Sequence, residues 1–139
     1  MQTRDASTPQ DVHGAVTIDQ RVIGSRQRER YMGSIAENGG LSLAVEDGRV
    51  IAFCCLDHRY FFEKPFISLL IVHPNFRRRG VGRGLLKSSE AKGYPELWTS
   101  TNRSNAPMQA LLQASDWHYC GELRGLDEGD PEMFFTKSL

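Results

Sequence analysis

An arginine- and glycine-rich turn in the middle of the chain narrows the range of possible folds. The segment Arg77-Arg78-Arg79-Gly80-Val81-Gly82-Arg83-Gly84 follows an apolar run at 66–72, which His73-Pro74 ends because proline cannot continue a central strand. A helix pattern then extends from 81 to about 92, and Gly93 ends it. A buried strand that leads through glycines into a helix directs backbone N–H groups and the positive end of the helix toward one point. The sequence therefore predicts a mixed α/β fold with an anion-binding site at this turn.

The rest of the chain shows strand patterns on both sides of this turn, with helix patterns between them. We expect strands at 2–6, 41–46, 50–58, 66–72, 97–100, 119–123 and 133–137, and helices at 11–23, at 25–37 and from Asn105 onward. Asp11 is expected to cap the first helix, and Asp47-Gly48 predicts a two-residue hairpin turn. The strand at 66–72 is apolar apart from Ser68, which predicts a central strand covered on both faces. No linker divides the chain, so residues 1–139 are expected to form one domain.

Composition argues against several classes of function. Lys plus Arg and Asp plus Glu each number 17, and this balance gives no overall attraction to nucleic acid or to an anionic membrane. The apolar run at 66–72 is far shorter than the about 20 residues that a membrane helix needs, and residues 1–7 do not resemble a secretory signal. Three cysteines, two of them adjacent, are expected to stay reduced, and no Cys/His spacing suits a metal. We therefore expect a cytoplasmic protein without a metal, a nucleic-acid partner or a membrane partner.

The identity of the anion at the turn is open to several interpretations. The turn is not a Walker A loop, because no Gly-Lys-Ser/Thr follows it, and it is a poor dinucleotide fingerprint, because no βαβ unit with a ribose-binding acid follows. A solvated basic turn before a helix is the structural alternative. Nucleic-acid binding through residues 77–83 is a further alternative, against which the zero net charge argues.

The flanking residues favour one family. Arg77, Gly80 and Gly82 match the Arg/Gln-x-x-Gly-x-Gly/Ala pattern, and the segments at 69–74 and 104–117 add the expected strand and helix before and after it. This order resembles motif A and its surroundings in the GNAT superfamily of N-acetyltransferases. The resemblance implies a mixed, mostly antiparallel central sheet, flanked by helices, whose fourth and fifth strands splay apart.

The resemblance also implies a cofactor site and a reaction. Acetyl-CoA would bind with its pantetheine arm along Leu70, Ile71 and Val72, its pyrophosphate at residues 77–84, and Asn105 near the pantetheine. The acetyl group would pass to a primary amine of a small molecule or peptide by direct attack in a ternary complex. Dimers are common in the family, so the resemblance also points to a homodimer.

The proton-handling positions depart from the family pattern. Leu112 stands where a tyrosine often protonates the leaving thiolate, and Phe66 stands near the place of a glutamate base. Glu63, Ser68 and Tyr119 are the remaining candidates for a catalytic group. A weakly catalytic acyl-CoA-binding module, acting as a sensor or partner subunit, is therefore the alternative function. The acidic loop at 127–132 would attract a cationic amine if it lies at the mouth of the acceptor cleft.

Overall fold

A computed structural model describes all residues, 1–139, and places seven strands in one sheet. The strand order is β1-β2-β3-β4-β5-β7-β6, and every neighbouring pair is antiparallel except β4 and β5, which are parallel. The strands are β1 (Gln2–Asp5), β2 (Leu41–Glu46), β3 (Arg49–Phe61), β4 (Lys64–Val72), β5 (Glu96–Asn102), β6 (His118–Leu123) and β7 (Glu132–Ser138). The predicted mixed, mostly antiparallel sheet is confirmed.

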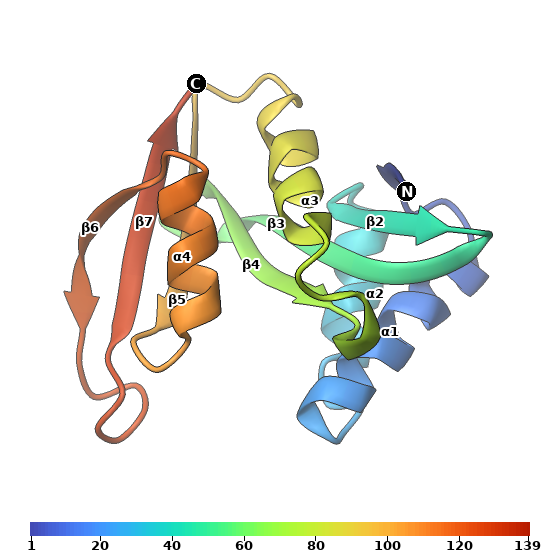
Figure 1. Cartoon of the computed structure of the whole chain (residues 1–139), viewed down its shortest axis with the longest axis horizontal. Helices are drawn as coiled ribbons and strands as arrows, with labels where there is room; N and C mark the ends of the chain where they lie inside the picture. Colours follow the sequence, from blue (N-terminus) through green and yellow to red (C-terminus); the bar gives the residue numbers. More distant parts are fainter.

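Helices cover both faces of the sheet (Figure 1). The helices are α1 (Pro9–Ile23), α2 (Glu29–Glu37), α3 (Val81–Glu90) and α4 (Ala106–Ala114), with a short 3-10 turn, η1 (Pro74–Phe76). Apolar residues of α1 and α2 pack on one face, against Leu41, Leu43 and Phe53. The larger cluster on the other face joins α3 and α4 to β3, β4, β5 and β7. No helix has the length and apolarity needed to cross a membrane.

The start of α1 differs from the sequence prediction. Thr8, not Asp11, is the N-cap, and Asp11 is the third residue of the helix, where it completes a capping box with Thr8. The Asp11 carboxylate also accepts two hydrogen bonds from Arg4, at 2.8 and 2.9 Å, and one from the Ser7 amide. These contacts lower the pKa of Asp11 far below its ordinary value, chiefly through the Arg4 hydrogen bonds. They tie β1 to the first helix.

The strands next to the centre are longer than predicted. The Asp47-Gly48 turn joins β2 and β3 as expected, and both residues have positive φ. The β3–β4 hairpin, however, extends to Phe61 and Lys64 and turns through Phe62 and Glu63, which also have positive φ. The prediction of a fully covered strand at 66–72 is wrong beyond Ile67, since residues 68–72 are only half-buried. The reason is a gap in the sheet beside them.

Candidate active site

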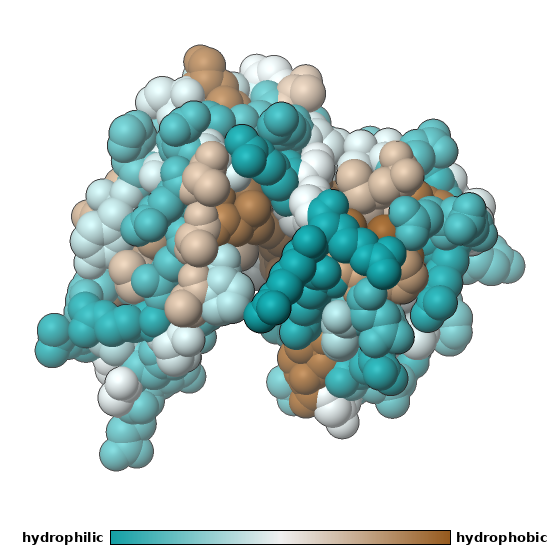
Figure 2. Space-filling model, in the orientation of Figure 1, coloured by the Kyte–Doolittle hydropathy of each residue, from teal (hydrophilic) through white to brown (hydrophobic).

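The sheet opens between its two parallel strands. Only Phe66 and Ile67 of β4 pair with β5, opposite Trp98 and Thr99. Beyond them β4 keeps its partner β3, and β5 keeps its partner β7, so the two strands diverge. Figure 2 shows this face of the molecule hollowed between the half that carries α4 and the half that carries α1 and α2. The predicted splay of the fourth and fifth strands is therefore present.

A β-bulge lies where the opening begins. Cys55 pairs with Leu69 and Leu56 pairs with Ile67, which leaves Ser68 as an extra residue without a partner on β3. A bulge bends its strand and redirects a side chain, and bulges are frequent next to active sites. Here the Ser68 side chain reaches Tyr31 of α2.

The backbone of β4 beyond the bulge presents unpaired groups to the gap. The His73 amide donates to the Ile51 carbonyl at 2.9 Å, and hydrogen-bonded positions alternate along an antiparallel ladder. Leu70 and Val72 therefore direct their backbone N–H and C=O groups away from β3, toward the gap. The Val72 carbonyl also accepts a hydrogen bond from Arg77 Nε at 3.1 Å. This edge can accept an extended ligand by strand addition.

The N-terminus of α3 lies at the end of the same strand. Gly80 is its N-cap, with a φ of 78° that favours glycine, and no side chain caps the helix. The amides of Val81, Gly82 and Arg83 lie in the first helical turn, where N–H groups lack an intrahelical acceptor. The Gly84 amide is not free, because it donates to the Gly80 carbonyl at 3.0 Å. Three backbone donors and the helix dipole thus meet at one place, which suits a phosphate.

The four arginines of the turn do not act alike. Arg79 lies over the Phe76 ring, 5.1 Å from its centroid, and 3.9 Å from Glu46. Arg77 holds the end of β4, as described above. Neither Arg78 nor Arg83 forms an ion pair, and both are exposed beside the helix start. Arg78 also has a φ of 64°, an uncommon value for a residue with a side chain.

A cleft of about 670 Å³ occupies the gap. Residues of α2, β4, β5 and α4 line it, together with Asp127 and Glu132 from the two ends of the acidic loop. Asn105 caps α4 by accepting from the Met108 amide at 3.2 Å, which leaves its own amide N–H groups free at the cleft wall. Arg28, the only cationic side chain of the wall, is held by Asp19, with 3.0 Å between Nε and Oδ2.

A cluster of three polar side chains lies beside this cleft, and two of them, Tyr31 and Ser68, line it. The Tyr31 hydroxyl donates to Asp57 Oδ2 at 2.7 Å and lies 2.6 Å from Ser68 Oγ. Asp57 is buried on β3, and its other oxygen accepts from the Arg59 amide at 2.8 Å. Burial raises the pKa of the Tyr31 phenol well above its ordinary value, and the hydrogen bond to Asp57 raises it further. Tyr31 therefore keeps its proton throughout the physiological range.

Only one of the three predicted catalytic candidates lies in the cleft. Ser68 lines it, whereas Glu63 lies exposed in the β3–β4 turn. Tyr119 is half-exposed on the edge strand β6, where its hydroxyl donates to Glu122 at 3.3 Å. The sequence prediction did not include Tyr31 or Asp57. Asp57 was nevertheless detectable as the one carboxylate in the apolar strand pattern at 50–58.

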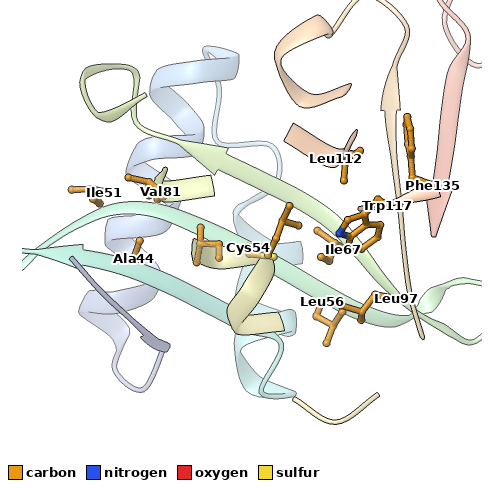
Figure 3. Packing of buried hydrophobic residues seen from close by; sticks show 13 residues of the cluster. Ala44, Ile51, Cys54, Leu56, Ile67, Val81, Leu97, Leu112, Trp117 and Phe135 are labelled. Atoms are coloured by element: carbon orange, nitrogen blue, oxygen red, sulfur yellow. The ribbon is translucent and has the colours of Figure 1, made fainter. Parts of the chain in front are cut away.

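The two positions that depart from the family pattern are filled by core side chains. Leu112 is fully buried beside Trp117 and Phe135 in the larger cluster (Figure 3). Phe66 is 1% exposed and packs against Tyr60, Phe61 and Phe134. Neither side chain lines the cleft. Both positions therefore contribute packing, and the cleft contains no group at either place that could transfer a proton.

Comparison with known proteins identifies relatives of this architecture. The acetyltransferase (GNAT) family profile matches residues 10–116. An acetyltransferase of the GNAT family from Bacillus cereus is 34% identical, with a TM-score of 0.93 over 99% of this chain and 96% of that one. No curated protein matches.

More distant structures share the fold. The ribosomal-protein-S18-alanine N-acetyltransferase of Escherichia coli is 21% identical, with a TM-score of 0.79 over 99% of this chain and 92% of that chain. The structure of yncA from Salmonella typhimurium, a putative acetyltransferase solved with its cofactor acetyl-CoA, is 16% identical. Its TM-score is 0.80 over 100% of this chain and 94% of that chain. At these identities the likeness concerns the fold alone. The family profile and the Bacillus cereus structure show more: the chain belongs to the GNAT family of acetyltransferases.

Proposed function

We propose that the protein transfers an acetyl group from acetyl-CoA to a primary amine. The observation that carries the proposal is the continuous path from the free first-turn amides of α3, along the unpaired β4 edge, into the acid-lined cleft. The amides of Val81, Gly82 and Arg83 would hold the pyrophosphate. The backbone of Leu70 and Val72 would hold the pantetheine arm, and Asn105 would donate to it. Bound in this way, acetyl-CoA supplies an activated thioester.

The chain's own residues fit a direct transfer. Cys54 and Cys55 are buried in the two clusters, and burial raises the pKa of both thiols. Cys120 is exposed on β6 and does not line the cleft. No cysteine thiol is therefore placed to carry the acetyl group, and in this proposal the amine attacks the thioester itself. A thiol with a pKa of about 8.5 leaves as a weakly basic anion, which water can protonate.

The charge of the cleft indicates a cationic acceptor. Asp127 and Glu132 line it, and their hydrogen-bond partners, Asn102 and Ser100, are neutral. The single arginine of the wall is already paired. The other loop acids lie elsewhere: Asp130 accepts from the Ser104 amide at 3.0 Å, and Glu128 is exposed outside the cleft. Two unpaired carboxylates at the acceptor end would concentrate an ammonium group there.

Two measurements test the proposal. CoA at a hundredfold excess over its dissociation constant should stabilise the fold by about 2.7 kcal/mol, because it binds only the folded state. Release of CoA thiol from acetyl-CoA should then be measured across a panel of amines. A melting temperature that millimolar CoA does not change would contradict the cofactor site. Tight CoA binding without thiol release on any amine would instead favour the acyl-CoA-binding module, which the apolar Leu112 and Phe66 positions also favour.

The acceptor end has its own test. The double change Asp127→Asn and Glu132→Gln should raise KM for the amine several-fold at low salt, and added salt should reduce the difference. KM for acetyl-CoA should not change. Glu128→Gln, which removes one charge from the same loop outside the cleft, is the control. An equal rise in both KM values would place the two acids away from the acceptor.

A further inference from the structure

We propose that Ser68, Tyr31 and Asp57 form a proton exit that leads from the acceptor cleft to a second pocket on the other side of Tyr31. In this arrangement Ser68 is the catalytic residue that contacts the amine, and Tyr31 and Asp57 are positioning residues that act through it. The inference rests on the proposed acetyl transfer, because only that reaction must remove a proton from an acceptor ammonium.

The chemistry of the three groups sets the direction of their hydrogen bonds. An ionised carboxylate can only accept, so the Tyr31 hydroxyl must use its single proton on Asp57. Tyr31 then has no proton left for Ser68, and the 2.6 Å contact between them requires Ser68 to donate. The Ser68 hydroxyl is consequently left with lone pairs alone for any ligand in the cleft. It can accept a hydrogen bond from an N–H group of the ligand, but it has no proton left to donate to the ligand.

The cluster connects two separate cavities. Ser68 lines the cleft between β4 and β5, and Asp57 lines a pocket of about 410 Å³ whose wall includes the exposed residues His58 and Arg59. Tyr31 lines both cavities. The relay therefore has an acceptor end inside the cleft and a carboxylate end in a pocket that opens on the surface.

No charged side chain is bonded to the Asp57 carboxylate. No ion pair in the chain involves Asp57, whose two oxygens accept only from Tyr31 and the Arg59 amide. Among the neighbouring groups, Arg28 is paired with Asp19, burial raises the pKa of the Cys55 thiol, and neither His58 nor Arg59 forms an ion pair. Tyr31 is therefore the only side chain that donates a hydrogen bond to the carboxylate.

The proton movement balances without another reactant. The ammonium gives one proton to Ser68 Oγ, Ser68 passes its own proton to the Tyr31 oxygen, and Tyr31 passes its own to Asp57. The neutral amine then forms the C–N bond as the C–S bond breaks, and the thiolate takes the sulfur electron pair. The second amine proton neutralises the thiolate directly or through water. Asp57 returns the first proton to solvent through the second pocket.

The test compares the variants Ser68→Ala, Tyr31→Phe and Ser68→Thr with the wild-type protein, all as full-length chains. Tyr94→Phe is the matched control, because it removes a tyrosine hydroxyl that belongs to the second pocket but not to the relay. The probes are spermidine, tyramine, L-lysine and an alanine-initiated peptide. Three quantities are measured: CoA affinity, amine affinity of the CoA complex by calorimetry, and kcat/KM for the amine as a function of pH.

We expect Ser68→Ala and Tyr31→Phe to lower kcat/KM for the amine at pH 7 by about a hundredfold, as the loss of a positioned proton acceptor does. In both variants kcat/KM should rise with pH up to the pKa of the free amine, about 10.4 for a lysine-type group. In the wild type it should level off at lower pH, since the ammonium is deprotonated after binding. Ser68→Ala should also weaken amine binding to the CoA complex about tenfold, with CoA affinity within twofold of the wild type. Ser68→Thr should restore activity, and Tyr94→Phe should match the wild type.

Two results would overturn the proton exit. One is a Ser68→Ala profile that levels off at the same pH as the wild type. The other is an equal loss of kcat/KM in Tyr94→Phe, which would show a general effect of the second pocket. Failure of the proposed function itself looks different, because the wild type would then release no CoA thiol with any amine, whether or not it binds CoA.

Discussion

The substitution Gly82→Ala tests CoA binding at the phosphate site with little effect on the packing of α3. The structure places a β-carbon at position 82 at 3.1 Å from Leu111 Cδ2 and 3.8 Å from Val72 Cγ2, between the end of β4 and α4. Leu111 is half-buried and must move by a few tenths of an ångström, which costs about 1 kcal/mol. Replacing a helical glycine by alanine stabilises the folded helix by about 0.5–1 kcal/mol. The two terms nearly cancel, so the free energy of unfolding should change by less than about 1 kcal/mol.

The expected effect on CoA binding is larger. The added methyl stands beside the Gly82 amide, one of the three free donors of the first turn, and should remove at least one hydrogen bond to the pyrophosphate. A hydrogen bond to a charged group contributes about 1.5–3 kcal/mol, which corresponds to a loss of affinity of about tenfold to hundredfold. Calorimetric titration with CoA measures the affinity, and thermal unfolding measures the stability.

Gly84→Ala is the matched control on the same helix. Its β-carbon would lie 2.8 Å from Met1 Cε, the end of a flexible side chain, and the Gly84 amide is already bonded to Gly80. CoA affinity should therefore stay within twofold of the wild type. Wild-type affinity in Gly82→Ala, or an equal loss in Gly84→Ala, would refute the placement of the pyrophosphate at the first turn of α3.

Three further predictions follow from buried groups. Leu112→Tyr should overpack the core, cost about 1–3 kcal/mol and lower the melting temperature without a faster reaction, whereas faster transfer at wild-type stability would show that a phenol there reaches the cleft. A thiol reagent at pH 8 should label Cys120 alone, because burial raises the pKa of Cys54 to about 11; labelling of Cys54 in the folded protein would contradict its burial. Asp11→Asn should cost about 2 kcal/mol at pH 7 through the lost Arg4 contacts. Since the folded-state pKa of Asp11 is depressed, its stabilisation is complete above about pH 4 and is lost as the pH falls below that value, so melting curves of wild type and variant should converge in acid.

Local chemistry accounts for the parts of the fold that could be predicted from the sequence. The strand at Leu41–Glu46 and the Asp47-Gly48 turn match the prediction because alternation and a two-residue turn are properties of neighbouring residues. The start of α3 matches for the same reason, since Gly80 must adopt a positive φ to lead the chain from strand to helix. Near the chain start, however, Thr8 and not Asp11 is the N-cap, because Asp11 acts as its partner in a capping box and also binds Arg4 of β1.

The acceptor end of the site depends on contacts between distant segments. Tyr31, Asp57 and Ser68 belong to α2, β3 and β4, and no spacing in the sequence relates them. Ser68 meets Tyr31 because a bulge in the β3–β4 register leaves it unpaired, at the point where β5 departs from β4. Register and splay are set by how whole strands pack against the helices on both faces. The phosphate turn can therefore be predicted from the sequence, because it is a local motif. The polar cluster forms only when the sheet has assembled, because its three residues come from distant segments.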